Sequence, residues 1–174
     1  MNFAAELSHR SWRPAVDRVV ATVLEEPARL PELIVTLADG REGVVMRGAM
    51  ALADLGRAAP DLLVPHHRAL VAALDPDPID AVNRCLFRYF AELPLDRIDP
   101  GVEGPLLDLA FRRGADPRRS VTIRIWGLQI VANYCGRYPE LADELRAVVT
   151  QQLDGAPAGF RSRGRRILRQ LGAG

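Results

Sequence analysis

The stretch REGVVMRGAMALADLGRAAPDLLVPHHRALVAALD, residues 41–75, contains two helical patterns separated by a proline. In its first half, apolar and small residues recur at steps of three and four, the period of one helix face: Val44, Gly48, Ala51, Leu52 and Leu55. Pro60 ends this helix, and Asp61 places an acid near the positive end of the next one. The apolar stripe continues through Leu62, His66, Leu70 and Leu74. The stretch therefore predicts an antiparallel helical hairpin.

A two-helix hairpin cannot bury both of its faces alone, so it must stack on similar units. The rest of the chain predicts such units: helix pairs within residues 11–40, 79–114 and 118–155, and single helices at 2–9 and 158–171. The helix at 118–136 is apolar on several faces, so we expect it to be the longest and most buried. With 48% hydrophobic and 26% charged residues, the chain is expected to fold as one all-α domain over residues 1–174.

The helix pairs repeat at a spacing close to 40 residues. Segments 60–75 and 139–154 share a frame of 16 residues and start 79 residues apart. An arginine also recurs in the first helix of each unit, as Arg13, Arg47, Arg84, Arg124 and Arg163. A two-helix unit repeated at about 40 residues is typical of a HEAT- or armadillo-like α-solenoid. We therefore predict an α–α superhelix of about four hairpins with terminal helices.

Four segments carry a resemblance to a known family: VVMRGAMALADLGRAAPDLLVPH, DAVNRCLFRYFAELPL, SVTIRIWGLQIVANYCGRYPELADELRAVV and AGFRSRGRRIL. From about residue 41 onward the chain resembles small bacterial HEAT-like repeat proteins. The resemblance implies a superhelical fold and no particular reaction. Some members carry the label adenylosuccinate lyase, but the serine-rich, lysine-containing signature loop of that enzyme is missing here, and the chain has no lysine.

Charge is distributed unevenly along the chain. All 23 basic residues apart from histidine are arginines, which reflects either GC-rich codon use or selection for guanidinium chemistry. Residues 1–116 hold 13 arginines and 18 acids, whereas residues 117–174 hold 10 arginines and 4 acids. This asymmetry predicts a basic surface at the C-terminal end of the molecule.

The candidate binding residues are all arginines: Arg47, Arg84, Arg124, Arg161, Arg163, Arg165 and Arg166. Repeated positions such as Arg84 and Arg124 would form a ladder along one face, able to grip phosphates or acidic peptides. Alternatively, each arginine pairs with an acid of its own or the adjacent repeat. The C-terminal cluster, which includes Arg169 and has Arg118 and Arg119 nearby in the repeat layout, either binds nucleic acid or serves as a solvated cap.

Histidines and cysteines offer no metal or redox chemistry. Adjacent His66 and His67 point about 100° apart on a helix, so they cannot share one metal. We expect His66 to be half-buried on the core stripe and His67 to be exposed. Cys85 and Cys135 lie in apolar runs and are expected to be small buried hydrophobes rather than a disulfide. No Cys/His set has metal-ligand spacing, so neither a metal nor another cofactor is expected.

Five aromatic residues remain to be assigned: Phe87, Tyr89, Phe90, Trp126 and Tyr134. HEAT-like DNA glycosylases use aromatic side chains and a carboxylate on a basic concave surface, but core packing is the simpler role, above all for Trp126 in its apolar helix. No nucleophile elbow, phosphate-binding glycine loop or dinucleotide fingerprint is present.

Three functions remain open after these observations. The leading hypothesis is a non-enzymatic binding module for a protein or peptide partner. The second is nucleic-acid binding through the arginine-rich C-terminal end, and the third is an enzyme of the base-excision type. The sequence shows neither a signal peptide nor a membrane-spanning run, so a cytoplasmic location is expected. The identity of the partner and the oligomeric state stay undetermined.

Overall fold

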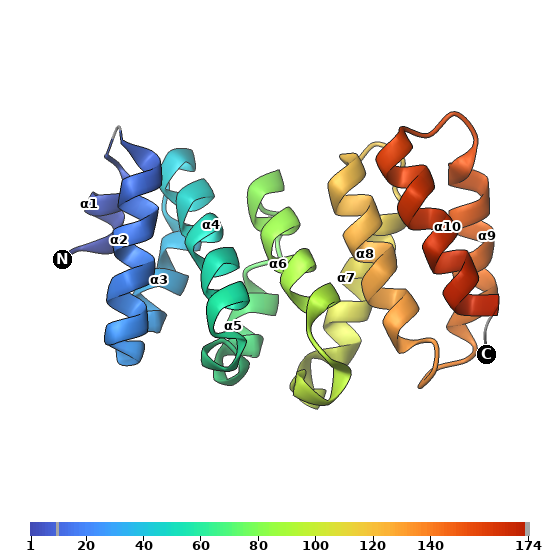
Figure 1. Cartoon of the computed structure of the whole chain (residues 1–174), viewed down its shortest axis with the longest axis horizontal. Coiled ribbons are helices and arrows are strands. Elements are labelled where there is room, and N and C mark those ends of the chain that lie inside the picture. The colour runs from blue at the N-terminus through green and yellow to red at the C-terminus, as the bar shows by residue number, and fades with distance from the viewer. Residues whose placement is uncertain (10, 173–174) are drawn as a thin grey trace.

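The computed structural model describes residues 1–9 and 11–172, which form ten α-helices joined by short loops (Figure 1). The α-helices are α1 Phe3–Leu7, α2 Trp12–Glu25, α3 Leu30–Val35, α4 Glu42–Ala58, α5 His67–Ala72, α6 Asp80–Glu92, α7 Glu103–Ala115, α8 Val121–Tyr134, α9 Leu141–Leu153 and α10 Ala158–Gly172. Short 3-10 turns are η1 Pro27–Arg29, η2 Thr36–Ala38, η3 Pro60–Leu62, η4 Val64–His66, η5 Leu95–Arg97 and η6 Pro100–Val102.

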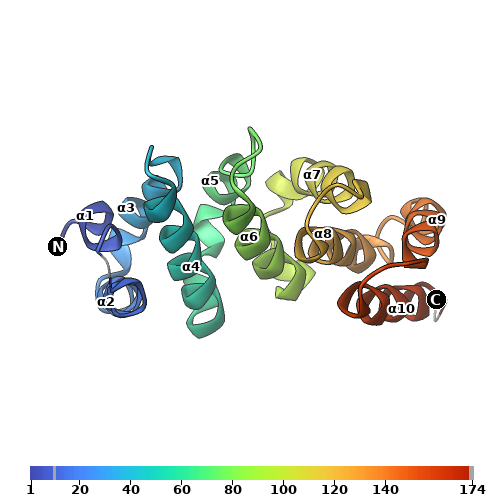
Figure 2. The same cartoon turned by 90° about the horizontal axis from the view of Figure 1, so that it is seen from above.

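The helices stack in two layers (Figure 2). The inner layer consists of α2, α4, α6, α8 and α10, and each of these helices packs directly on the next. The outer layer consists of α1, α3, α5, α7 and α9. Helices α3, α5, α7 and α9 make few or no direct contacts with one another. The stack therefore curves around the inner layer.

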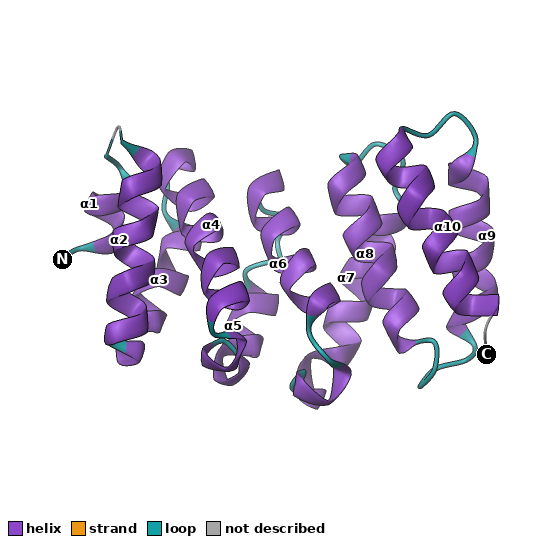
Figure 3. Cartoon of the chain, in the orientation of Figure 1, coloured by secondary structure: helices purple, strands orange, loops and turns teal. Residues whose placement is uncertain are grey.

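Four hairpins, α2–α3, α4–α5, α6–α7 and α8–α9, lie between α1 and α10. No strand interrupts the described residues (Figure 3). This arrangement confirms the predicted α–α superhelix with terminal helices. Within the same residues, no helix is long and apolar enough to cross a lipid bilayer.

A single cluster of buried side chains runs between the layers from Phe3 to Ile167. The two cysteines are free, as expected. Helix α8 contacts α6, α7, α9 and α10 and is buried on most of its circumference, which confirms its predicted central position. It is not the longest helix, however, because α4 has 17 residues and α8 has 14. The Asp116 carboxylate accepts the backbone N–H of Arg118 at 3.0 Å, and this turn delays the start of α8 to Val121.

Two glycines let α7 and α8 approach closely. A Cβ atom on Gly127 would lie 2.6 Å from the carbonyl oxygen of Ala110 and 3.3 Å from the Cα of Gly114. A Cβ atom on Gly114 would in turn lie 2.9 Å from the backbone nitrogen of Leu128. Real Cβ atoms do not approach backbone atoms this closely, so the helix pair depends on glycine at both positions.

The second helix predicted for the 41–75 hairpin is broken. Turns η3 and η4 replace its first half, and α5 begins only at His67. A 3-10 turn takes three residues rather than 3.6, and Pro65 has no N–H to continue an α-helix. The buried positions shift accordingly to Leu63, His67, Leu70 and Leu74. His66 is half-buried, as predicted, but the assignment of His67 to the surface is wrong.

The His67 side chain is fully buried between α5 and α6, and both of its ring nitrogens make hydrogen bonds. Its Nδ1 accepts the backbone N–H of Asp99 at 3.1 Å, so the ring proton sits on Nε2. Nε2 donates to the Tyr89 hydroxyl at 2.9 Å, and that hydroxyl donates to the carbonyl of Pro60 at 3.3 Å. Burial lowers the pKa of His67; the charge of Asp99 opposes this effect and that of His66 adds to it.

The free energy of unfolding should fall as the pH drops below the unfolded pKa of histidine, about 6.5. The folded protein holds His67 neutral, so below that pH the unfolded chain binds more protons and is favoured. Urea unfolding between pH 8 and pH 5 measures this change in the free energy of unfolding. The control is His67→Gln, because the glutamine side chain has a hydrogen-bond donor and an acceptor but does not titrate. Parallel pH profiles for the two proteins would contradict the assignment.

Candidate binding surface on the inner layer

The repeated arginines lie one on each inner-layer helix, but their side chains do not form a continuous free row. Arg13 pairs with Asp17 at 2.7 Å and with Asp54 of the next repeat at 2.9 Å. Arg84 is exposed on α6 and has no ion pair within the described part of the chain. Arg13 therefore pairs with acids, as one alternative predicts, whereas Arg84 is exposed, as the ladder alternative predicts.

Arg47 and Arg124 donate hydrogen bonds to neutral acceptors within the protein. Arg47 donates from Nη1 to the carbonyl oxygens of Leu7 at 2.5 Å and His9 at 3.1 Å, beyond the end of α1. Arg124 is buried and donates from Nε and Nη2 to Gln152 Oε1 at 3.0 and 2.6 Å. Both side chains are therefore engaged within the protein rather than presented to a partner.

Arg163 belongs to a different arrangement, centred on Trp126. Its guanidinium carbon lies 4.5 Å from the centre of the Trp126 ring, and that of Arg88 lies 5.6 Å from the same centre. Arg88, Trp126 and Arg163 come from α6, α8 and α10, three successive inner-layer helices. Each cation–π contact contributes about 0.5–2 kcal/mol, depending on how well water is excluded. Trp126 is half-buried, so it packs on the core and still reaches the surface.

The charges around this tryptophan are unbalanced. Burial lowers the pKa of Arg163, and the neighbouring charges of Arg166 and Arg88 lower it further, while Glu92 raises it. Glu92 pairs with Arg88 at 3.0 Å. The guanidinium groups of Arg88, Arg163 and Arg166 thus outnumber the one carboxylate named here, that of Glu92. The region therefore has a positive potential.

A hollow of about 140 Å³ opens between α4 and α6, and Arg88 is one of the residues that line it. Arg57, Arg88, Arg97 and Glu92 line it together with apolar residues that include Ala53, Pro60 and Leu93. Arg57 also pairs with Asp54, and Arg97 with Asp61, two acids that do not line the hollow. We call Arg57, Arg88, Arg97, Trp126 and Arg163 the Arg–Trp surface. It can hold an anionic group next to an apolar one.

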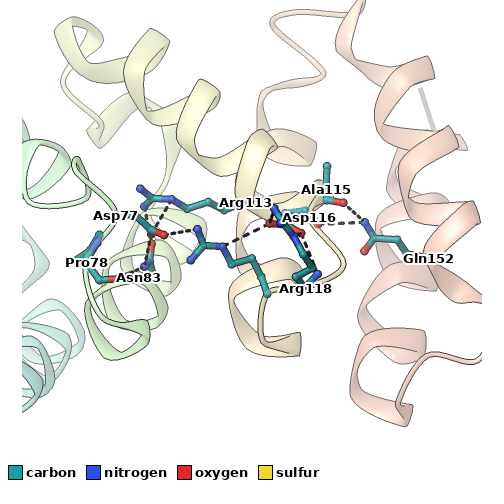
Figure 4. A network of polar contacts seen from close by, with 10 residues as sticks. Asp77, Pro78, Asn83, Arg113, Ala115, Asp116, Arg118 and Gln152 are labelled. Atoms are coloured by element: carbon teal, nitrogen blue, oxygen red, sulfur yellow. Dashed lines mark hydrogen bonds and ion pairs between the residues drawn. The ribbon is translucent and has the colours of Figure 1, made fainter.

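A second set of polar residues joins the loops of three repeats (Figure 4). Buried Arg113 donates to Asn83 Oδ1 at 2.6 Å and to the carbonyl oxygen of Leu74 at 2.5 Å. Asp77 pairs with Arg119, and Asp116 pairs with Arg118, which lowers the pKa of Asp116 to about 2. Arg118 and Arg119, which we expected beside the basic C-terminal end, are therefore matched by acids of this network.

Four of the five aromatic residues are buried: Phe87, Tyr89, Phe90 and Tyr134. Their ring faces pack inside the protein and are not available to stack on a base of nucleic acid. Trp126 alone of this group reaches the surface, so core packing describes most of the set.

Sequence reasoning missed Arg57, Arg88 and Arg97, which lie outside the repeated arginine positions. A signal was present for Arg88: it follows Arg84 by one helical turn on the same helix. That Arg88 meets Trp126 depends on how α6 crosses α8, which is a tertiary property.

Stacked hairpins with a continuous core and an inner layer of repeated helices define a helical-repeat protein of the α-solenoid class. The HEAT repeat domain family model matches residues 3–171, so the chain belongs to the HEAT repeat domain family. No curated protein matches the chain. Among solved structures, a designed armadillo repeat protein is similar, with a TM-score of 0.49 and 13% identity over 97% of this chain and 98% of that one.

Proposed function

We propose that this protein is a non-enzymatic binding scaffold that holds an acidic segment of a partner protein along its inner layer. The observation that carries the proposal is the Arg–Trp surface. Arg57, Arg88 and Arg97 line a small hollow there, and Glu92 is the one acid lining it. Arg88 also lies against half-buried Trp126, which Arg163 contacts as well.

The chemistry of the surface matches an acidic peptide. An aspartate or glutamate of the partner would enter the hollow, where forked guanidinium groups bind carboxylates with two parallel hydrogen bonds. An adjacent apolar side chain would pack on the open part of Trp126. Tryptophan and arginine are the residues most often found at the energetic centres of protein interfaces.

The stacked helices also favour binding by a rigid platform. Trp126 and Arg163 are positioned by α8 and α10, and Gln129 Oε1 accepts a hydrogen bond from Arg163 at 3.3 Å. Little side-chain freedom then remains to be lost on binding, which lowers the entropic cost of association.

A displayed library of random peptides tests the proposal. We expect the selected peptides to be acidic, and the Arg88→Gln/Arg97→Gln variant to weaken their binding at least about tenfold, or about 1.4 kcal/mol. Isothermal titration measures the affinities. The matched control is Arg112→Gln, because Arg112 is also exposed and pairs with an acid four residues away, Asp108, but on the outer layer.

The control should bind the peptides with an affinity within about twofold of that of the unchanged protein. A twofold change in affinity corresponds to less than about 0.5 kcal/mol of binding free energy. Selected peptides without a negative charge would contradict the proposal. So would an equal loss in the Arg88→Gln/Arg97→Gln and Arg112→Gln proteins.

A further inference from the structure

Helix α10 presents one side that is rich in cations. Its apolar side faces the core through Phe160 and Ile167, and Gly164 packs on α9. The opposite side is exposed and carries Arg161, Arg165, Arg166 and Arg169. The helix contains no acidic residue.

These arginines lack the ion pairs that most arginines elsewhere in the described residues have. Among the described arginines before residue 120, all except Arg47 and Arg84 lie within 4.0 Å of a carboxylate. In α10, Arg161 donates to the carbonyl of Ala156, and Arg163 packs on Trp126. Arg165, Arg166 and Arg169 have neither an ion pair nor a hydrogen bond within the described residues.

The spacing makes this side a row of charges. Arg161, Arg165 and Arg169 are four residues apart, so they follow one another at about 6 Å along the helix axis. Arg166 follows Arg163 by three residues, so the two are neighbours on the surface of the helix. Ser162 and Ala158 are exposed beside them, so the row has no large apolar side chain of its own.

We infer that the exposed side of α10 binds the phosphate backbone of a nucleic acid. A phosphodiester chain is a regular line of anions that guanidinium groups recognise without any pocket. No acid of α10 competes for these guanidinium groups. The inference is separate from the proposed function, because Arg165, Arg166 and Arg169 do not belong to the Arg–Trp surface.

Two other polyanions fit this surface less well. An acidic peptide needs apolar anchors to reach a useful affinity, and the row offers none. A helix lying on an anionic membrane inserts exposed leucine or aromatic side chains, whereas the large apolar residues of α10 face the protein core.

Fluorescence anisotropy with a labelled single strand of about 20 nucleotides tests the inference, over NaCl from about 50 to 200 mM. We expect Arg165→Gln/Arg166→Gln/Arg169→Gln to weaken binding at least about tenfold at the lowest salt. It should also reduce the slope of log K against log salt by about two to three, because each lost phosphate contact removes about 0.7–0.9 from the slope.

The control is Arg18→Gln/Arg68→Gln/Arg112→Gln, which makes the same change in net charge at three exposed, ion-paired positions. It should bind within about twofold of the unchanged protein. Equal losses in both triple variants would overturn the inference, as would an absence of binding at low salt. Equally tight binding to polyglutamate, or to vesicles with anionic phosphatidylserine, would also overturn it. The two experiments are independent: the Arg88→Gln/Arg97→Gln protein tests peptide binding, and its result does not decide whether α10 binds a nucleic acid.

Discussion

Replacing Arg113 by methionine should lower the free energy of unfolding by about 2–6 kcal/mol, which is about 1–3 kcal/mol for each of the two buried acceptors that lose their donor. Arg113 is 5% exposed and connects α7 to α6 of the same hairpin and to the end of the preceding hairpin at Leu74. Without it, the carbonyl oxygen of Leu74 loses its guanidinium donor, and so does the side-chain oxygen of Asn83. A buried acceptor left without a donor costs about 1–3 kcal/mol.

Urea unfolding measures this loss, and the neighbouring residue supplies the control. Arg112 is exposed and pairs with exposed Asp108, so Arg112→Met should cost at most about 1 kcal/mol. Arg113→Lys keeps the charge but not the forked donors, and it should fall between the two methionine variants. An Arg113→Met protein as stable as Arg112→Met would show that the network in Figure 4 does not hold the repeats together.

Gly127→Ala should cost about 2–3 kcal/mol of unfolding free energy, although alanine is the better helix former. The added methyl group would lie 2.6 Å from the Ala110 carbonyl oxygen, which belongs to the backbone of α7 and cannot rotate away. Helices α7 and α8 must then separate, and the packing of both is lost together. Chemical denaturation followed by circular dichroism measures the effect.

Gly104→Ala is the matched control for this prediction. Gly104 lies in α7 of the same helix pair, and a Cβ there would meet no atom within 4 Å. It should stabilise the protein by about 0.5–1 kcal/mol, the usual difference between alanine and glycine in a helix. If the Gly127→Ala protein were also stabilised, α7 and α8 would not be as close as the structure places them.

Much of the fold could be predicted from local patterns. Prolines and helical periodicity marked the hairpins, and the arginine repeat at about 40 residues assigned one arginine to each inner-layer helix. The prediction failed where local geometry changed the period. Turns η3 and η4 shifted the buried stripe and placed His67 in the core instead of on the surface. A proline-interrupted segment has no single period, so its register cannot be deduced from apolar spacing.

The candidate site was less predictable than the fold. Equivalent repeat positions suggested that Arg47, Arg84, Arg124 and Arg163 would act alike, yet their partners are backbone carbonyls, solvent, an amide and a tryptophan. Such long side chains reach whatever acceptor the next repeat offers. That choice depends on helix crossing angles, which are set by side-chain packing between distant segments.

The sequence by itself determined the all-α class, the stacking of hairpins and the concentration of positive charge at the C-terminal end, because periodicity, proline positions and composition are local properties. The tertiary structure alone decided which arginines are buried, paired or exposed, and that Arg88 and Arg163 meet on Trp126. These outcomes depend on distances between residues far apart in the chain, and only the packed helices establish those distances.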